Sequence, residues 1–231
     1  VYACARNWEK LCRNTEERGM HACRDAKEVA DSADLVILAV KPYMIQEVTA
    51  PIREELKDKI VVSVAAGYPF EKLEQDLLPG THHLSICPNT PVAVAEGIIV
   101  CEDKHSLTGE EFEMVKDLFE KIALVETVDT AHLSVAGTVC GCTPAYAAMF
   151  IEALGDAGVK HGLTRAQAYR FAAQMLVGTG KLHLETGQHP GAMKDAVCSP
   201  GGTTIVGVAS LERSGFRSAI IDAIDDVENK P

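Results

Sequence analysis

One glycine-rich stretch carries the residues best suited to bind a small ligand, and it reads Ser199-Pro-Gly-Gly-Thr-Thr-Ile205. Pro200 ends any preceding helix, and the two glycines allow conformations and close approaches that a Cβ forbids. Thr203 and Thr204 then open a run with apolar residues at helical spacing. The stretch predicts a helix N-terminus with free N–H groups and two hydroxyls, suited to a small carboxylate. An ordinary turn followed by a threonine-capped helix fits the same spacing.

Strand and helix signals alternate over the first half of the chain. The apolar runs at 34–40 and 59–67 are typical of buried parallel strands. Such alternation is the pattern of a doubly wound α/β sheet, in which ligands bind beyond the carboxyl ends of the strands. Further strands are expected at 1–5, 83–87, 97–101 and 124–128. Helices are expected near 8–12, 26–32 and 43–56. One more helix is expected to begin after a capping box at Thr108–Glu111 and to run to residue 122.

Strand signals stop after about residue 128, and the rest of the chain is alanine-rich and helical. We therefore expect two domains, 1–128 and 129–231. In the second, apolar residues cover several helix faces, so these helices either form their own bundle or share their core with a second subunit. The expected helices are 131–160, interrupted near Pro144, then 164–185, 190–198 and two after the glycine-rich stretch.

The overall composition excludes several classes of partner. The 231 residues carry a net charge of −11, which argues against nucleic acid or an anionic membrane as the main partner. Apolar runs fall short of the roughly 20 residues that span a bilayer, and no leader is recognised, so we expect a soluble, cytoplasmic protein. The eight cysteines are scattered without a Cys-x-x-Cys pair, which indicates reduced thiols and no metal site.

Several motifs, taken together and in order, resemble the pyrroline-5-carboxylate reductase family. They are Ala39-Val-Lys-Pro42, Pro88-Asn-Thr-Pro91 with Glu96-Gly97, Pro144-Ala-Tyr146 with Glu152-Ala-Leu154, and the glycine-rich stretch with Leu211-Glu-Arg-Ser-Gly-Phe-Arg217. The resemblance covers essentially the whole chain. It implies a Rossmann-type domain, an all-α dimerisation domain, a homodimer or larger assembly, and reduction of 1-pyrroline-5-carboxylate to L-proline with NADPH or NADH.

The same resemblance assigns the cofactor contacts. Arg6 would face the 2′-phosphate of NADPH, although a solvated surface arginine fits equally. Asn89 and Thr90 lie between two prolines and would face the nicotinamide ring, although a plain proline-bounded turn has the same sequence. The implied cofactor-binding residues are Cys4, Arg6, Ala39, Val40, Lys41, Pro42, Val64, Ala65, Ala66, Asn89 and Thr90.

On the substrate side, the resemblance places the carboxylate on backbone amides around 201–204. The Thr204 hydroxyl would be catalytic, because it would lie near the ring nitrogen and could orient the imine or share its proton. The histidines of the second half are expected at the surface or at helix caps. The implied substrate-binding residues are Ser199, Gly201, Gly202, Thr203 and Thr204.

One departure from the family concerns the cofactor. The family's first βα unit holds the pyrophosphate on a Gly-x-Gly-x-x-Gly turn, and no such turn occurs in the 231 residues. We therefore expect weak nicotinamide nucleotide binding by a truncated first domain. Two alternatives stay open. The first is a related reductase of another cyclic imine or of a β-hydroxy acid, and the absence of a catalytic lysine motif disfavours the β-hydroxy acid. The second is an inactive form that only dimerises.

Overall fold

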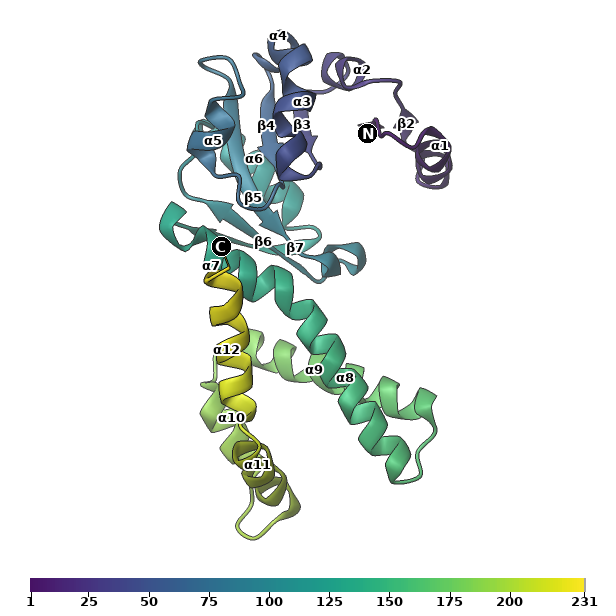
Figure 1. Ribbon diagram of the computed structural model, residues 1–231, viewed down its shortest axis with the longest axis vertical. Helices are drawn as coiled ribbons and strands as arrows, with labels where there is room; N and C mark the ends of the chain where they lie inside the picture. The colour runs from purple at the N-terminus through teal and green to yellow at the C-terminus, as the bar shows by residue number, and fades with distance from the viewer. Residues whose placement is uncertain (231) are drawn as a thin grey trace. The chain divides into compact units, whose positions relative to one another are not determined.

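The computed structural model describes residues 1–230, and its central element is a five-stranded sheet in the order β3-β4-β5-β6-β7 (Figure 1). β3, β4 and β5 are parallel, as the sequence predicts. β6 runs antiparallel to β5, because the connection contains only the short 3-10 helix η3 (Thr90–Val94), too short for a parallel crossover. The strands are β3 (Leu35–Leu38), β4 (Ile60–Ser63), β5 (His82–Pro88), β6 (Gly97–Glu102) and β7 (Ala123–Val128).

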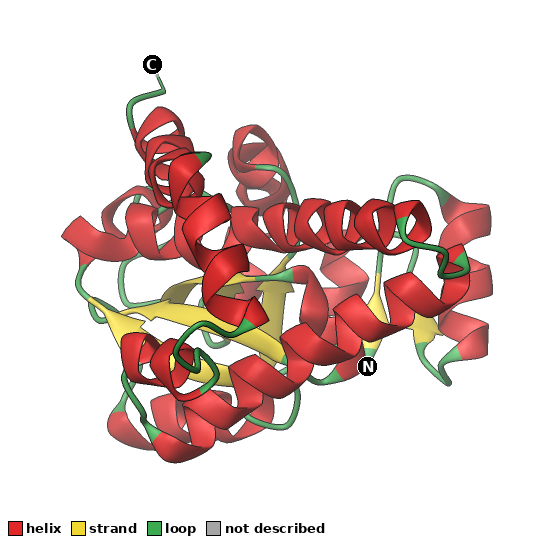
Figure 2. Cartoon of the chain, turned by 90° about the horizontal axis from the view of Figure 1, so that it is seen from below, coloured by secondary structure: helices red, strands yellow, loops and turns green. Residues whose placement is uncertain are grey.

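The first strand belongs to a separate two-stranded sheet. β1 (Tyr2–Ala3) pairs in parallel with β2 (His21–Ala22), with Tyr2 opposite His21. Figure 1 and Figure 2 both show this small pair apart from the five-stranded sheet. The strand at the start of the chain was predicted over 1–5, whereas β2 was not predicted.

Helices cover both faces of the main sheet. α6 (Gly109–Phe119) covers one face and begins with the predicted capping box, in which Thr108 and Glu111 bond each other's backbone. The predicted helix over 43–56 is broken into four short pieces. Pro51 lacks the N–H that a continuous helix needs, which accounts for the break that follows Thr49. The remaining helices before Gly137 are α1 (Trp8–Glu17), α2 (Ala26–Asp31), η1 (Pro42–Met44), α3 (Ile45–Thr49), η2 (Ala50–Ile52), α4 (Arg53–Leu56), α5 (Phe70–Glu74), η4 (Thr130–His132) and α7 (Leu133–Gly137).

The chain divides into two compact units, one ending at Gly141 and the other beginning at Cys142. The predicted domain boundary at residue 128 lies before this observed boundary, because α7 and the π-helix η5 (Thr138–Cys142) still pack on the first unit. A Cβ at Gly137 would lie 3.2 Å from the Cys87 sulfur of β5. The π-helix is the interruption predicted near Pro144. Residues 130–141 form the connector between the last strand of the sheet and the helical unit.

The second unit is entirely helical in the residues described. Its helices match the predicted segments to within a few residues, except that the predicted segment 131–160 also spans η4, α7 and η5 before α8 begins. α9 begins with a second capping box at Thr164 and Gln167. They are α8 (Thr143–Lys160), α9 (Arg165–Thr186), α10 (Pro190–Ala196), α11 (Thr203–Arg213) and α12 (Phe216–Glu228).

α8 and α9 approach each other closely through small residues. A Cβ added at Gly158 would lie 2.8 Å from the Ala168 Cβ and 3.3 Å from Leu163 Cδ1. Ala168 is buried and its Cβ cannot rotate away. The glycine therefore sets how closely the two helices pack.

A Gly158→Ala substitution is expected to lower the free energy of unfolding by about 1–3 kcal/mol, because the helices must separate. Thermal unfolding measures this effect. Gly109→Ala is the control, since no atom lies within 4 Å of a Cβ there, and we expect a change within about 0.5 kcal/mol. Equal stability of the two variants would contradict the packing argument.

The helical unit buries little of its apolar surface on its own. Gly155, Ala168 and Ala172 are its buried residues among those described. The helical stretch Thr130–Lys160 has the length and composition of a membrane span, which the sequence prediction missed, with 11% of its most apolar window buried. A helix of this kind is weak evidence for a membrane. Large exposed apolar residues include Met149, Phe171, Leu184, Val206 and Ile221.

Candidate active site

Two of the predicted cofactor loops meet at one edge of the main sheet. β3 and β4 are parallel with Leu38 opposite Ser63, so the loops 39–42 and 64–67 leave the sheet side by side. The second loop turns at Gly67, whose φ of +68° is in the left-handed region that favours glycine, and no atom lies within 4 Å of where its Cβ would be. Ala39, Lys41 and Ala66 are exposed, whereas Ala65 is buried. This edge is therefore open to a ligand.

A buried serine supports this edge, and sequence reasoning missed it. Ser85 of β5 donates a hydrogen bond from Oγ to the Tyr68 carbonyl at 2.8 Å, directly after Gly67. The Ser63 hydroxyl accepts a hydrogen bond from the Ala65 N–H at 3.3 Å. Serines within otherwise apolar buried strands were the available signal, because a buried hydroxyl needs a partner.

The Tyr68 side chain forms a second buried support. Its hydroxyl donates to the Asp76 carboxylate, whose own backbone carbonyl accepts from Arg53 Nε at 2.8 Å. Tyr68 and Asp76 are 7% and 5% exposed. Burial, followed by the neighbouring Asp76 carboxylate, raises the pKa of Tyr68 to about 12. These contacts hold the segment that leads from Gly67 into α5.

Stability at alkaline pH should depend on Tyr68. Because its pKa rises from 10.0 in the unfolded chain to about 12 in the folded one, its contribution is complete below pH 10.0 and is lost as pH rises through about 12. Tyr68→Phe is expected to lower stability by about 1–2 kcal/mol at neutral pH, since Asp76 loses its donor. Melting temperatures measured across this pH window should fall less steeply for the variant. A parallel decline in both proteins would contradict the assignment.

The end of β1 supplies a cation near this edge. Arg6 forms an ion pair with Glu47 of α3 at 3.7 Å between Nη2 and Oε2, and both side chains are 71% exposed. Exposed ion pairs contribute little, so the guanidinium can exchange this partner for a phosphate. Cys4 is also exposed here. The exposed Arg6 and Lys41 side chains have the charge that fits the anionic phosphates of a nicotinamide dinucleotide.

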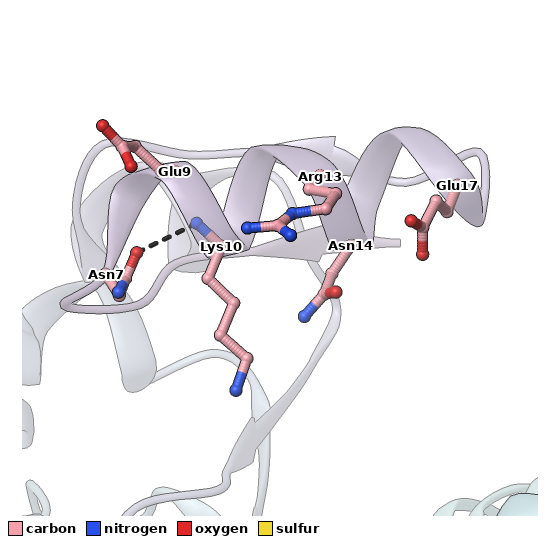
Figure 3. Close-up of a pocket in the computed structure, with 6 residues that line it drawn as sticks. All are labelled: Asn7, Glu9, Lys10, Arg13, Asn14 and Glu17. Atoms are coloured by element: carbon pink, nitrogen blue, oxygen red, sulfur yellow. Dashed lines mark hydrogen bonds between the residues drawn. The ribbon is translucent and has the colours of Figure 1, made fainter.

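A hollow on α1 adjoins Arg6 but does not belong to the predicted set. Figure 3 shows its polar side chains along one face of the helix, with Asn7 Oδ1 accepting a hydrogen bond from the Lys10 N–H at 2.9 Å. Its volume is about 410 Å³. The charges of its two carboxylates and two cations cancel, so the hollow offers no net positive charge to an anion. Its lining residues are Asn7, Glu9, Lys10, Arg13, Asn14 and Glu17.

The turn after β5 holds the last two predicted cofactor residues. Thr90 is exposed, and its side chain is available to a ligand. The Asn89 side chain is engaged within the protein: Oδ1 accepts from the Ile98 N–H at 3.0 Å, and Nδ2 donates to the Cys140 carbonyl at 3.1 Å. A direct contact between this carboxamide and a nicotinamide ring therefore competes with two existing hydrogen bonds.

The glycine-rich stretch forms a turn followed by a helix N-terminus, as predicted. The Gly202 N–H donates to the Ser199 carbonyl at 3.0 Å, and Gly201 has a φ of +67°. Gly202 is the N-cap of α11, which begins at Thr203 without any side-chain cap. The alternative of a threonine-capped helix is therefore wrong. The first amides of α11 have no intrahelical partner, and the hydroxyls of Thr203 and Thr204 are exposed.

The structure places the predicted site residues in two groups. The cofactor residues lie in the first unit, and Ser199, Gly201–Thr204 lie in the helical unit. Histidines of the second half are exposed, and His189 caps α10 by accepting from the Gly191 N–H at 3.1 Å. Among the described residues, no cluster of His, Cys, Asp and Glu could hold a metal ion.

Comparison with known proteins accounts for both units. Residues 130–230 match a family model described as pyrroline-5-carboxylate reductase dimerisation, and residues 1–67 match one described as NADP oxidoreductase, coenzyme F420-dependent. The pyrroline-5-carboxylate reductase of Treponema pallidum is 45% identical over 97% of this chain and 86% of its own length. The chain belongs to the pyrroline-5-carboxylate reductase family. The reductase of Escherichia coli is 42% identical over 94% of this chain and 81% of its own length.

Solved reductases of this family share the fold. A Plasmodium falciparum pyrroline carboxylate reductase with NADP bound is 27% identical and has a TM-score of 0.87, covering 98% of this chain and 84% of that one. The Coxiella burnetii pyrroline-5-carboxylate reductase is 28% identical with a TM-score of 0.88, covering 99% and 86%. The predicted Rossmann-like domain and helical dimerisation domain are thus confirmed. The dimerisation family match begins at residue 130, close to the predicted boundary.

Proposed function

We propose that this chain reduces 1-pyrroline-5-carboxylate to L-proline with NADPH, in the cytoplasm. The observation that carries the proposal is the similarity to pyrroline-5-carboxylate reductases along 94–97% of the chain, which includes the glycine-rich turn. The uncapped N-terminus of α11 provides what a small carboxylate requires. A related structure with NADP bound supports the choice of cofactor.

On this proposal the first unit binds the cofactor. When bound, NADPH supplies the hydride. Arg6 and Lys41 neutralise phosphate charge, and Pro42, at the start of η1, holds the loop after β3 in a fixed conformation. The remaining strand-end contacts come from backbone and small side chains of Ala39, Val40, Val64, Ala65 and Ala66, with Cys4 and Thr90 at the margins.

The helical unit binds the substrate. The N–H groups at the start of α11 hold the carboxylate, and Gly201 and Gly202 let it approach the backbone. The Thr204 hydroxyl donates a hydrogen bond to the ring nitrogen, which makes the adjacent carbon more electrophilic. Addition of the hydride to that carbon, and of a proton taken from solvent to the nitrogen, would complete the reduction. The arrangement requires no charged acid–base pair.

We further propose that two copies pair through their helical units. The evidence is the small number of buried residues in that unit and its large exposed side chains, such as Met149, Phe171 and Leu184. Exposed apolar surface on this scale is typical of a covered interface. On this view a second copy, and not a bilayer, covers the apolar stretch Thr130–Lys160.

Steady-state assays of the purified protein test the function. NADPH absorbance should fall only when 1-pyrroline-5-carboxylate is present, and proline should accumulate. Thr204→Val should lower kcat about 100-fold and Thr204→Ser much less, since serine keeps the hydroxyl. Reduction of other cyclic imines or β-hydroxy acid oxidation instead would favour a related reductase. If the protein dimerises but shows neither turnover nor thermal stabilisation by NADPH, the result would indicate a dimerisation module.

A further inference from the structure

Asn89 forms an unusual bridge between three segments that are distant in sequence. It follows the last residue of β5, and its backbone N–H donates to the Ile98 carbonyl at 3.2 Å. Its side-chain Oδ1 accepts from the Ile98 N–H at 3.0 Å. Backbone and side chain together therefore bond both polar backbone groups of Ile98, and this extends the β5–β6 pairing beyond the end of β5.

The other end of the same carboxamide reaches the connector. Asn89 Nδ2 donates to the Cys140 carbonyl at 3.1 Å, across 51 positions of sequence. Cys140 is 8% exposed and lies in the π-helix Thr138–Cys142. π-Helical turns are rare and occur frequently at functional sites. This one lies at the boundary of the compact units, so the bond fixes the last turn of the first unit.

A carboxamide is the side chain that this bridge requires. It presents an acceptor to the Ile98 N–H and a donor to the Cys140 carbonyl at the same time. An aspartate of the same shape would keep the first bond but would place a carboxylate oxygen against the carbonyl. An alanine would remove both bonds. The two substitutions therefore separate the contact with β6 from the contact with the connector.

We propose that Asn89 is a positioning residue for hydride transfer. This inference rests on the proposed function, which places the Pro88–Pro91 turn beside the nicotinamide ring. The Asn89 bridge ties this turn to the connector, from which the helical unit continues. Asn89 need not touch the ring: it holds the turn and the last residues of the first unit in one arrangement. A displacement of about 1 Å at a reacting centre can cost about 100-fold in rate.

The test compares Asn89→Asp and Asn89→Ala with the wild-type protein. Both variants should have a KM for NADPH similar to that of the wild type and a kcat lowered about 10- to 100-fold. Both should also give a larger primary isotope effect with 4-deuterated NADPH, because hydride transfer becomes more rate-limiting. A merely structural role would reduce the folded fraction without changing the isotope effect. Asn89→Asp with wild-type kcat and isotope effect would overturn the proposal.

A second measurement is independent of turnover. Hydrogen–deuterium exchange of the amides 138–142 should be faster in Asn89→Asp than in the wild type, while the amides of β5 and β6 remain protected. Unchanged exchange at 138–142 would overturn the bridge itself. An inactive wild-type protein with the expected exchange pattern would instead count against the proposed function, so the two failures are distinguishable.

Discussion

A Glu102→Ala variant is expected to lose about 3 kcal/mol of its free energy of unfolding. Glu102 is fully buried at the end of β6, where Oε2 accepts from the Phe70 N–H at 2.7 Å and Oε1 from the Thr130 hydroxyl at 2.6 Å. The first bond secures the N-terminus of α5 and the second secures the start of the connector. Alanine leaves a buried donor without a partner and opens a cavity.

Glu102→Gln is the matched control for that effect. Its carboxamide oxygen can accept from the Phe70 N–H, while its NH2 group donates to Thr130, whose hydroxyl can rotate to accept. We expect a loss of about 1 kcal/mol. Urea unfolding followed by circular dichroism measures all three proteins. Equal losses for alanine and glutamine would show that these two hydrogen bonds are not the source of the stability.

Gly202→Ala is expected to lower kcat/KM about 100-fold while changing thermal stability little. A Cβ at this position would lie 2.4 Å from the Ser199 hydroxyl, which must rotate away, and 3.1 Å from the Ser199 carbonyl oxygen, so the backbone of the turn before α11 must shift by a few tenths of an ångström. Because the turn is exposed, the global fold can accommodate the change. The amides proposed to hold the substrate carboxylate cannot keep their positions.

A double variant tests the steric cause. Adding Ser199→Gly to Gly202→Ala removes the nearest contact and should recover part of the lost activity, with Ser199→Gly alone as the reference. Steady-state kinetics with varied imine concentration should place the defect mainly in the KM for the imine. Full activity of Gly202→Ala, or no recovery in the double variant, would contradict this account of the turn.

Local signals were sufficient for most elements. The capping boxes at Thr108 and Thr164 start helices because the bonded partners are three residues apart. Buried strands were visible as apolar β-branched runs. The glycine-rich turn before α11 was predictable for the same reason: Ser199 and Gly202 are bonded within one turn.

Features that depend on distant residues were not predictable in this way. α5 and β2 were missed, since each is only two to five residues long and is defined by its neighbours. On α6, Val115 and Phe119 are buried but Leu118 is 45% exposed, because a period of 3.6 residues does not show how far a neighbouring element extends.

The sequence by itself therefore determined the fold class, the helical second half, and the turn and helix N-terminus at 199–204. The tertiary structure alone decided that Asn89 bonds Cys140 and that Glu102 bonds Thr130, 51 and 28 positions apart. Turns and caps are satisfied by adjacent residues, so composition and spacing reveal them. Buried polar groups take whichever partner the packing brings near, and that partner is known only once the strands and the connector are assembled.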